Sequence, residues 1–215
     1  MRNILIVFAF MALPLPAQQK GFTPVADYPA LEQEINNNSL KIKSISSDFV
    51  QEKKMEYLDE VIVSKGNFWY KHESKLRWQY NEPYEYIIAI NNGKFLLKDK
   101  GNVKVYDVAS NPAFKEMNDL ILRIARGTLA GDKRFKIEAF EDKDSYLLKL
   151  TPVEDNLKKF IHTTEVFLAS RIYLFTSDLA ADRVVMHESG SDYTVIQFIN
   201  RNINNEIADT VFDIR

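Results

Sequence analysis

The side chains suited to metal or acid–base chemistry are few in this sequence. It contains no cysteine and three histidines, His72, His162 and His187. None of these has a partner at metal-ligand spacing, and no H-E-x-x-H motif occurs. His187 and Glu188, beside a Ser-Gly turn, form the best candidate pair for metal binding or proton transfer. A solvated hairpin is the favoured explanation for this pair, and metal or acid–base chemistry is the alternative.

Other catalytic signatures are also missing from the sequence. There is no G-x-S-x-G motif and no glycine-rich phosphate loop in a chain with only seven glycines. With 30 acidic residues, carboxylate pairs are unavoidable, and their presence does not place two of them across a cleft. A formal net charge of −2 provides no basic field for a nucleic acid. We therefore predict a protein that is not an enzyme, binds no nucleic acid, and needs no metal or cofactor.

The most unusual chemistry of the chain is aromatic. The run FWYKHESKLRWQY, residues 68–80, contains both tryptophans. Within it Leu76, Trp78 and Tyr80 alternate with polar residues, which predicts that these three share one face of a strand. Such a face is either ordinary core or the wall of a cavity for an apolar ligand.

The rest of the pattern predicts the elements that would position this face. The chain has 215 residues, of which 46% are hydrophobic, and this indicates one globular domain. Alternation of apolar and polar residues predicts about eleven antiparallel strands, among them SRIYLFTS at 170–177 and ADTVFDI at 208–214. Turns are predicted at NNG, 91–93, and DKGN, 99–102, and a loop or lid at KKMEYLDE, 53–60.

Two helices are expected among these strands. Asp27 can cap the first, with Pro29 in its first turn and Leu31 and Ile35 on one face. The second lies between residues 114 and 129, where the apolar residues at helical spacing are Met117, Leu120, Ile121, Ile124 and Ala125.

The N-terminus resembles a targeting segment. Arg2 precedes the apolar run ILIVFAFMAL, residues 4–13, which is too short to span a bilayer. We predict a signal peptide over residues 1–17, removed after Ala17, and a single domain over residues 18–215; a buried first strand is the alternative. Without a cysteine at the cut, the exported product is predicted to be soluble and not lipidated.

Several motifs together resemble the LolA family, the periplasmic carriers of outer-membrane lipoproteins. They are Phe49 and Gln51 in SDFVQ, Gly66 and Trp69 in KGNFWYK, Arg77 and Trp78 in LRWQY, Pro83, Gly93 in NNGK, VYD at 105–107 and LKLTP at 148–152. Each motif is weak alone, but their order and spacing match the family over nearly all of the mature chain.

The resemblance implies a mainly β fold with a few helices. The expected fold is an incomplete, or half, antiparallel β-barrel closed by a helical lid, whose concave apolar face binds acyl chains. The cavity residues expected on this basis are Phe49, Phe68, Tyr70, Leu76, Trp78, Tyr80, Ile88, Ile90, Leu120, Ile121 and Ile124. A family arginine that ties the lid is replaced here by His72, so His72 and the neighbouring Arg77 are the expected lid contacts.

The resemblance also implies a function. The protein would be a monomeric periplasmic chaperone for triacylated lipoproteins, receiving them from an inner-membrane ABC-type transporter. It would deliver them to an outer-membrane acceptor, LolB-like where one exists. Four alternatives stay open: a carrier of other lipids or glycolipids on the same fold, an envelope sensor, an exported enzyme, and a structural or adhesion module.

Overall fold

The described residues of the protein form one twelve-stranded sheet. The computed structural model describes residues 21–72, 75–107, 119–120, 122–124, 128–158, 161–168, 181–188 and 190–213. The strands are β1 Thr23–Pro24, β2 Ser44–Lys54, β3 Ile62–Lys71, β4 Lys75–Glu82, β5 Tyr86–Asn91, β6 Lys94–Asp99, β7 Asn102–Asp107, β8 Phe135–Glu141, β9 Tyr146–Pro152, β10 Thr163–Leu168, β11 Ala181–His187 and β12 Tyr193–Ile203. The helices with both ends among the described residues are α1 Tyr28–Ser39, α3 Asp155–Lys158 and the 3₁₀ helix η3 Asp209–Phe212.

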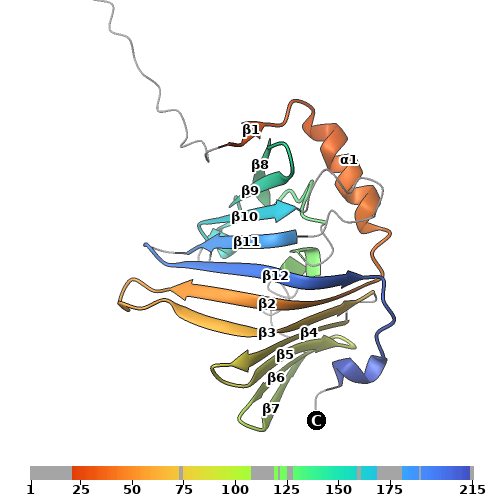
Figure 1. The fold of residues 1–215 in the computed structure, drawn as a ribbon, viewed down its shortest axis with the longest axis vertical. Helices are drawn as coiled ribbons and strands as arrows, with labels where there is room; N and C mark the ends of the chain where they lie inside the picture. The colour runs from red at the N-terminus through yellow and green to blue at the C-terminus, as the bar shows by residue number, and fades with distance from the viewer. Residues whose placement is uncertain are drawn as a thin grey trace, which may run out of the picture.

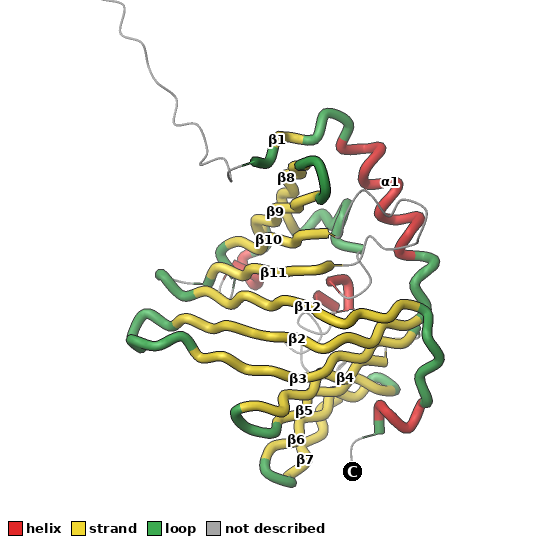
Figure 2. The backbone as a smooth tube through the Cα atoms, in the orientation of Figure 1, coloured by secondary structure: helices red, strands yellow, loops and turns green. Residues whose placement is uncertain are grey.

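The sheet is antiparallel, strongly curved and open (Figures 1 and 2). Its strand order is β1-β8-β9-β10-β11-β12-β2-β3-β4-β5-β6-β7. The long strands β2 and β12 pair at its centre, with Phe49 opposite Phe198, and so join the hairpins from the two halves of the chain. The predicted mainly β, antiparallel, incomplete barrel is confirmed, with twelve strands in the described residues where about eleven were expected.

Two hairpin turns form as the sequence predicts. Asn92 and Gly93 between β5 and β6 have φ of 50° and 71°, and Lys100 and Gly101 between β6 and β7 have φ of 47° and 82°. Two consecutive residues with positive φ define a type I′ turn, whose twist matches that of the flanking strands. These turns fix the register of β5, β6 and β7.

The predicted first helix is confirmed as α1. The Asp27 side chain accepts a hydrogen bond from the Ala30 N–H at 3.1 Å, which caps the helix, and Pro29 lies in its first turn. Leu31 and Ile35 are buried against the cluster formed by β8, β9, β10 and β11. Figure 1 shows α1 beside this end of the sheet. A second core cluster lies between β2, β3, β4, β5 and β6.

The C-terminal prediction was wrong. Residues 208–214 were expected to form a strand, but Asp209–Phe212 is the 3₁₀ helix η3. Both neighbouring strands, β4 and β5, already have a partner on each side, so no free edge exists there and the chain lies across the face of the sheet. Arg77 Nη1 donates to the Val211 carbonyl at 2.9 Å, and Phe212 is fully buried.

Other expectations are refined. The run 53–60 is a hairpin connection and not a lid, because Lys53 and Lys54 complete β2 and the chain turns into β3. The backbone N–H of Glu56 donates to the Asp192 carboxylate at 2.6 Å, which ties this hairpin to the turn before β12. The predicted strand at 170–177 and the predicted signal peptide lie outside the described residues. Among the helices that the structure describes, none is long and apolar enough to cross a membrane.

Candidate functional site

A cavity of about 320 Å³ lies on the concave face of the sheet. Its volume is near the lower end of the range of about 300–1,000 Å³ typical of small-molecule sites. The wall is almost entirely apolar. The residues that line it are Gln51, Phe68, Leu76, Trp78, Tyr80, Ile88, Leu120, Ile124, Ile161, Val184, Met186, Ile196 and Phe198.

Strand alternation places the aromatic part of the wall. Leu76, Trp78 and Tyr80 occupy every second position of β4 and therefore project to one face. Register brings further rings to Trp78: Phe68 lies directly opposite on β3, with ring centroids 5.3 Å apart, and Phe198 of β12 is 5.9 Å away. The result is an edge-to-face aromatic cluster that packs as core does, yet leaves a cavity beside it.

Most of the residues predicted from the sequence are found in this wall. Those that line the cavity are Phe68, Leu76, Trp78, Tyr80, Ile88, Leu120 and Ile124. Phe49, Tyr70 and Ile90 do not line it: they are 1%, 0% and 2% exposed and pack in the core around it. Phe49 supports the wall from behind, with its ring 4.9 Å from Trp78. Ile121 lies outside the described residues.

Sequence reasoning missed the half of the wall formed by later strands. Val184 and Met186 on β11 and Ile196 and Phe198 on β12 line the cavity, as does Ile161 before β10. All of these residues lie in segments predicted to be strands, Ile161 in the predicted strand at 159–168. Their alternation was the available signal, but nothing local shows that β12 pairs with β2 and faces the aromatic strands.

Three polar groups interrupt the apolar wall. The Tyr80 hydroxyl donates to Gln51 Oε1 at 3.0 Å. Burial raises the pKa of Tyr80 to about 12. The third group is Trp78 Nε1, which is buried and makes no hydrogen bond to any described residue.

One wall is helical, as predicted. Residues 119–120 and 122–124 are helical; this helical segment places Leu120 and Ile124 in the wall and buries Leu122 in the core beside it. Met117 and Ala125, predicted on the same helix, lie outside the described residues.

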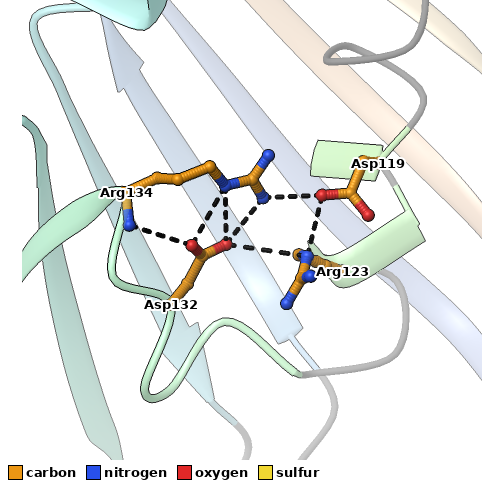
Figure 3. Close-up of polar contacts among 4 residues, drawn as sticks. All are labelled: Asp119, Arg123, Asp132 and Arg134. Atoms are coloured by element: carbon orange, nitrogen blue, oxygen red, sulfur yellow. Dashed lines mark hydrogen bonds and ion pairs between the residues drawn. The ribbon is translucent and has the colours of Figure 1, made fainter. Parts of the chain in front are cut away.

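The helical segment is held by four charged residues, Asp119, Arg123, Asp132 and Arg134, which we call the Asp–Arg cluster (Figure 3). Arg134 Nη2 is 2.7 Å from carboxylate oxygens of both Asp119 and Asp132, and Arg123 Nε is 2.9 Å from Asp119. The cluster therefore joins the helical segment to the loop that enters β8. The spacing of Asp119 and Arg123, four residues apart, is the one part of it that the sequence indicates.

Asp132 is the buried member of the Asp–Arg cluster, with 5% of its side chain exposed. Burial acts to raise its pKa, but hydrogen bonds from the side chain and backbone N–H of Arg134, and the charges of Arg134 and Arg123, outweigh burial. The pKa of Asp132 is consequently lowered from its ordinary value. The carboxylate is thus held ionised beside the cavity wall.

The two residues expected to hold the lid, His72 and Arg77, are not brought to the cavity. His72 is exposed, and its backbone N–H donates to the Lys43 carbonyl at 2.7 Å. Arg77 alternates with the cavity-lining residues of β4 and so projects to the opposite face, where it lies over the Trp69 ring at 5.8 Å and contacts η3. Among the described residues, the charged contacts of the helical segment come from the Asp–Arg cluster instead.

The candidate metal or acid–base pair has an ordinary structural environment. Glu188 forms an ion pair with Lys53 at 3.0 Å and accepts from the Thr194 hydroxyl at 2.9 Å. The described residues contain no group of three or more histidine and acidic side chains placed to hold a metal ion. These contacts fit the favoured explanation of a hairpin end.

The open sheet and its cavity define a class of protein: a curved antiparallel β scaffold with an apolar cavity on its concave face. The sequence model of the family described as outer membrane lipoprotein carrier protein LolA matches residues 40–215. The chain belongs to the LolA family, as its motifs suggested. Members of this family are periplasmic lipoprotein carriers and not enzymes.

Comparison with one solved structure whose TM-score is above 0.5 agrees on the fold. The chain superposes on Pseudomonas aeruginosa MucB in its complex with MucA with a TM-score of 0.53 and 12% identity, covering 88% of this chain and 62% of that one. For a LolA superfamily protein of Nitrosomonas europaea the values are 0.46 and 10%, with 85% and 97% covered. For the Mycobacterium tuberculosis lipoprotein LppX they are 0.47 and 12%, with 84% and 98% covered. None of the curated proteins compared with the chain matches it.

Proposed function

We propose that this protein is a periplasmic chaperone that shields the acyl chains of lipoproteins in its cavity and carries them from the inner to the outer membrane. The observation that carries this proposal is the apolar cavity itself, formed in a LolA-family chain by strands from both halves of the sheet and one helical wall. It accounts for the aromatic face of β4, which would otherwise be a packed core without a void.

The energetics explain why a carrier is needed. Each methylene exposed to water costs about 0.8 kcal/mol, so three chains of roughly sixteen carbons would cost on the order of 35–40 kcal/mol as an upper bound. No membrane anchor of this kind crosses an aqueous space unaided. The cavity therefore has to bind the acyl chains about as strongly as the membrane does. A cavity that bound them much more strongly would not release them.

The size of the cavity indicates that cargo binding involves movement. A volume of about 320 Å³ suits one small ligand and not three long acyl chains. Leu120 and Ile124 are the wall residues on the helical segment, whereas the other wall residues, apart from Ile161 in the connection before β10, lie on the continuous sheet. We infer that the helical segment is displaced as cargo enters, with lipid contacts offsetting the lost helix–sheet contacts.

The family and the N-terminal sequence support a route for the cargo. Residues 1–17 act as a signal peptide, and residues 18–215 form the exported single domain. This domain works as a monomer, receives triacylated lipoproteins from an inner-membrane ABC-type transporter and passes them to an outer-membrane acceptor, LolB-like where one exists.

The small cavity favours one alternative on the same fold. A lipid with one or two acyl chains, such as a phospholipid or glycolipid, requires less enlargement of a cavity of about 320 Å³ than a triacylated cargo does. The two possibilities differ in what the protein carries and not in how the wall binds it.

Native mass spectrometry of the tagged protein, purified from its own envelope, tests the proposal. Ile88→Glu and Met186→Glu place a charge in opposite parts of the wall, on β5 and β11, and Val105→Glu on the exposed surface of β7 is the matched control. We expect bound lipoprotein in the wild type and in V105E and its loss in both cavity variants, with circular dichroism unchanged.

The outcomes separate the candidates. Phospholipid or glycolipid in place of lipoprotein would select the alternative cargo. Equal loading of the wild type, I88E and M186E would contradict the cavity as the binding site.

A further inference from the structure

The polar groups of the cavity wall lie together. The described wall contributes one amide, from Gln51 on β2, and one hydroxyl and one indole N–H, from Tyr80 and Trp78 on β4, the two strands on either side of β3. The Tyr80 hydroxyl binds one end of the Gln51 amide at 3.0 Å. A primary amide has a donor end and an acceptor end, so the other end of Gln51 stays available, and it makes no hydrogen bond to any described residue.

Trp78 supplies a second unused donor. Its Nε1–H is buried without a hydrogen bond to any described residue, which is an unfavourable state for a donor in an apolar environment. The ring is fixed by Phe49 and Phe68 on its flanks, at 4.9 Å and 5.3 Å, so the N–H does not turn freely toward another partner. An acceptor delivered by a ligand would remove this penalty.

The positions of Gln51, Trp78 and Tyr80 along their strands indicate which part of a bound ligand they contact. Leu76, at one end of β4, is fully buried, whereas Trp78 and Tyr80 nearer the other end are partly exposed, as is Gln51. Hydrocarbon that enters with its methyl end first fills the closed end beside Leu76. The polar atom at the head of the chain then lies near Gln51, Trp78 and Tyr80.

We propose that Gln51, Trp78 and Tyr80 form a subsite for the carbonyl oxygen at the head of an acyl chain. The Trp78 N–H and the Gln51 amide donate to this oxygen, and the Tyr80 hydroxyl orients the Gln51 amide. The cavity then recognises the acyl linkage, ester or amide, and not hydrocarbon alone. This inference rests on the proposed function, because it assumes that acyl chains enter the cavity.

The subsite makes the cavity wall selective for acylated ligands and weakens their release only slightly. A purely apolar wall distinguishes ligands by area alone, so alkanes, ethers and esters of one length bind alike. A single hydrogen bond to a buried donor adds about tenfold in affinity. That is enough to favour an acylated ligand over other apolar molecules of the envelope without making transfer irreversible.

A competition experiment tests the subsite. The protein is incubated with vesicles that contain equal amounts of dihexadecanoyl phosphatidylcholine and its di-O-hexadecyl ether analogue, which differ only in the carbonyl groups. Native mass spectrometry then gives the ratio of the two bound lipids. We expect the wild type to bind the ester about five- to tenfold in excess. In Gln51→Met and Trp78→Phe the ratio should fall to near one, while the amount of bound ether lipid is kept.

Two controls lie outside the cavity. Gln79→Met makes the same change on the opposite face of β4, where Gln79 accepts from Arg77, and Tyr84→Phe removes an exposed hydroxyl. Both should keep the wild-type ratio. Because the ratio compares two lipids in one sample, a loss of stability in a variant does not imitate the effect.

The possible failures are distinct. A wild-type ratio near one, with lipid bound, overturns the subsite and leaves the proposed function intact. A preference for ester that persists in Q51M and W78F also overturns it, since the selectivity then arises elsewhere. Folded wild-type protein that takes up neither lipid nor acylated lipoprotein overturns the proposed function and this inference with it.

Discussion

Asp119 and Arg134 form an ion pair of 2.7 Å that joins the helical wall of the cavity to the loop entering β8. This pair provides a charged contact to the helical segment. The family resemblance had led us to expect such a contact from His72 or Arg77. Asp119 lies on the helical segment, one residue before the wall residue Leu120. Any displacement of the helical segment that enlarges the cavity therefore either breaks this ion pair or moves the loop before β8 together with the segment (Figure 3).

The first prediction concerns the rate of opening. Asp119→Asn removes one ion pair with Arg134 and one with Arg123, both partly exposed. Such pairs contribute about 0.2–1 kcal/mol each, so we expect uptake of an apolar fluorescent probe to accelerate about two- to fivefold. Stopped-flow fluorescence measures the rate. Asp155→Asn, which breaks the exposed pair with Lys158 on α3, is the control and should leave the rate unchanged.

Acid stability gives the second prediction. The pKa of Asp132 is lowered in the folded protein. Its stabilisation is therefore fully present above the unfolded-chain pKa of about 3.9 and is lost as the pH falls through the lower folded value. We expect Asp132→Asn to lower the free energy of unfolding by about 2 kcal/mol at pH 7 and to have a smaller effect below about pH 3.

Urea unfolding at the two pH values measures this difference. Asp59→Asn, on the exposed β2–β3 hairpin connection, is the control and should change stability by less than about 0.5 kcal/mol. An equal loss in D132N at both pH values would show that the side chain stabilises by packing and not by its charge.

Gly66 on β3 provides the third prediction. A Cβ at this position would lie 1.9 Å from the Gln79 carbonyl oxygen and 2.8 Å from the Phe49 ring. Because the close contact is with backbone, relief requires β3 and β4 to separate beneath the aromatic wall. We expect Gly66→Ala to cost about 2–3 kcal/mol and lower Tm by about 5–10 °C.

Differential scanning calorimetry measures this shift. Gly101→Asn is the comparison, because a Cβ added to the turn residue Gly101 would meet no other atom within 4 Å and asparagine tolerates its positive φ. A Tm in G66A equal to that of the wild type would mean that the two strands separate without cost.

The fourth prediction concerns the C-terminal helix. Phe212 is fully buried, and its carbonyl accepts from the Asn91 side chain at 3.4 Å on the face opposite the cavity. Removing a buried phenylalanine costs about 3–4 kcal/mol, so Phe212→Ala should lower Tm by about 10 °C. Because the change is on the convex face, the folded variant should still bind an apolar probe with wild-type affinity. Titration of that probe well below Tm checks the second point, and a large loss of affinity would show that η3 and the cavity are coupled.

Features decided by local sequence were predictable. The positive φ of Asn92 and Gly93 follows from residue types that favour a tight hairpin, and the cap at Asp27 follows from its position before Pro29 and Leu31. The cavity-lining role of Leu76 and Trp78 followed from alternation together with the family resemblance.

Features decided by distant pairing were not predictable. Phe198 reaches Trp78 because β12 pairs with β2, a contact between the two halves of the chain that no local pattern specifies. The alternation of residues 208–214 suited a strand equally well, and only the absence of a free edge beside β4 and β5 makes this segment a 3₁₀ helix. The pairing of Asp119 with Arg134 likewise depends on the path of the loop before β8.

The central claim is that acyl chains of lipoproteins occupy the cavity, and site-specific photocrosslinking in the native envelope tests it most directly. A benzophenone amino acid at Ile88 probes the cavity wall, and the same residue at Val105 probes the exposed surface of β7. We predict crosslinks from position 88 to acylated lipoproteins through their lipid-bearing N-terminal peptide, and none of these from position 105. Crosslinks to lipoproteins from position 105 alone, or from neither position in folded protein, would contradict the account.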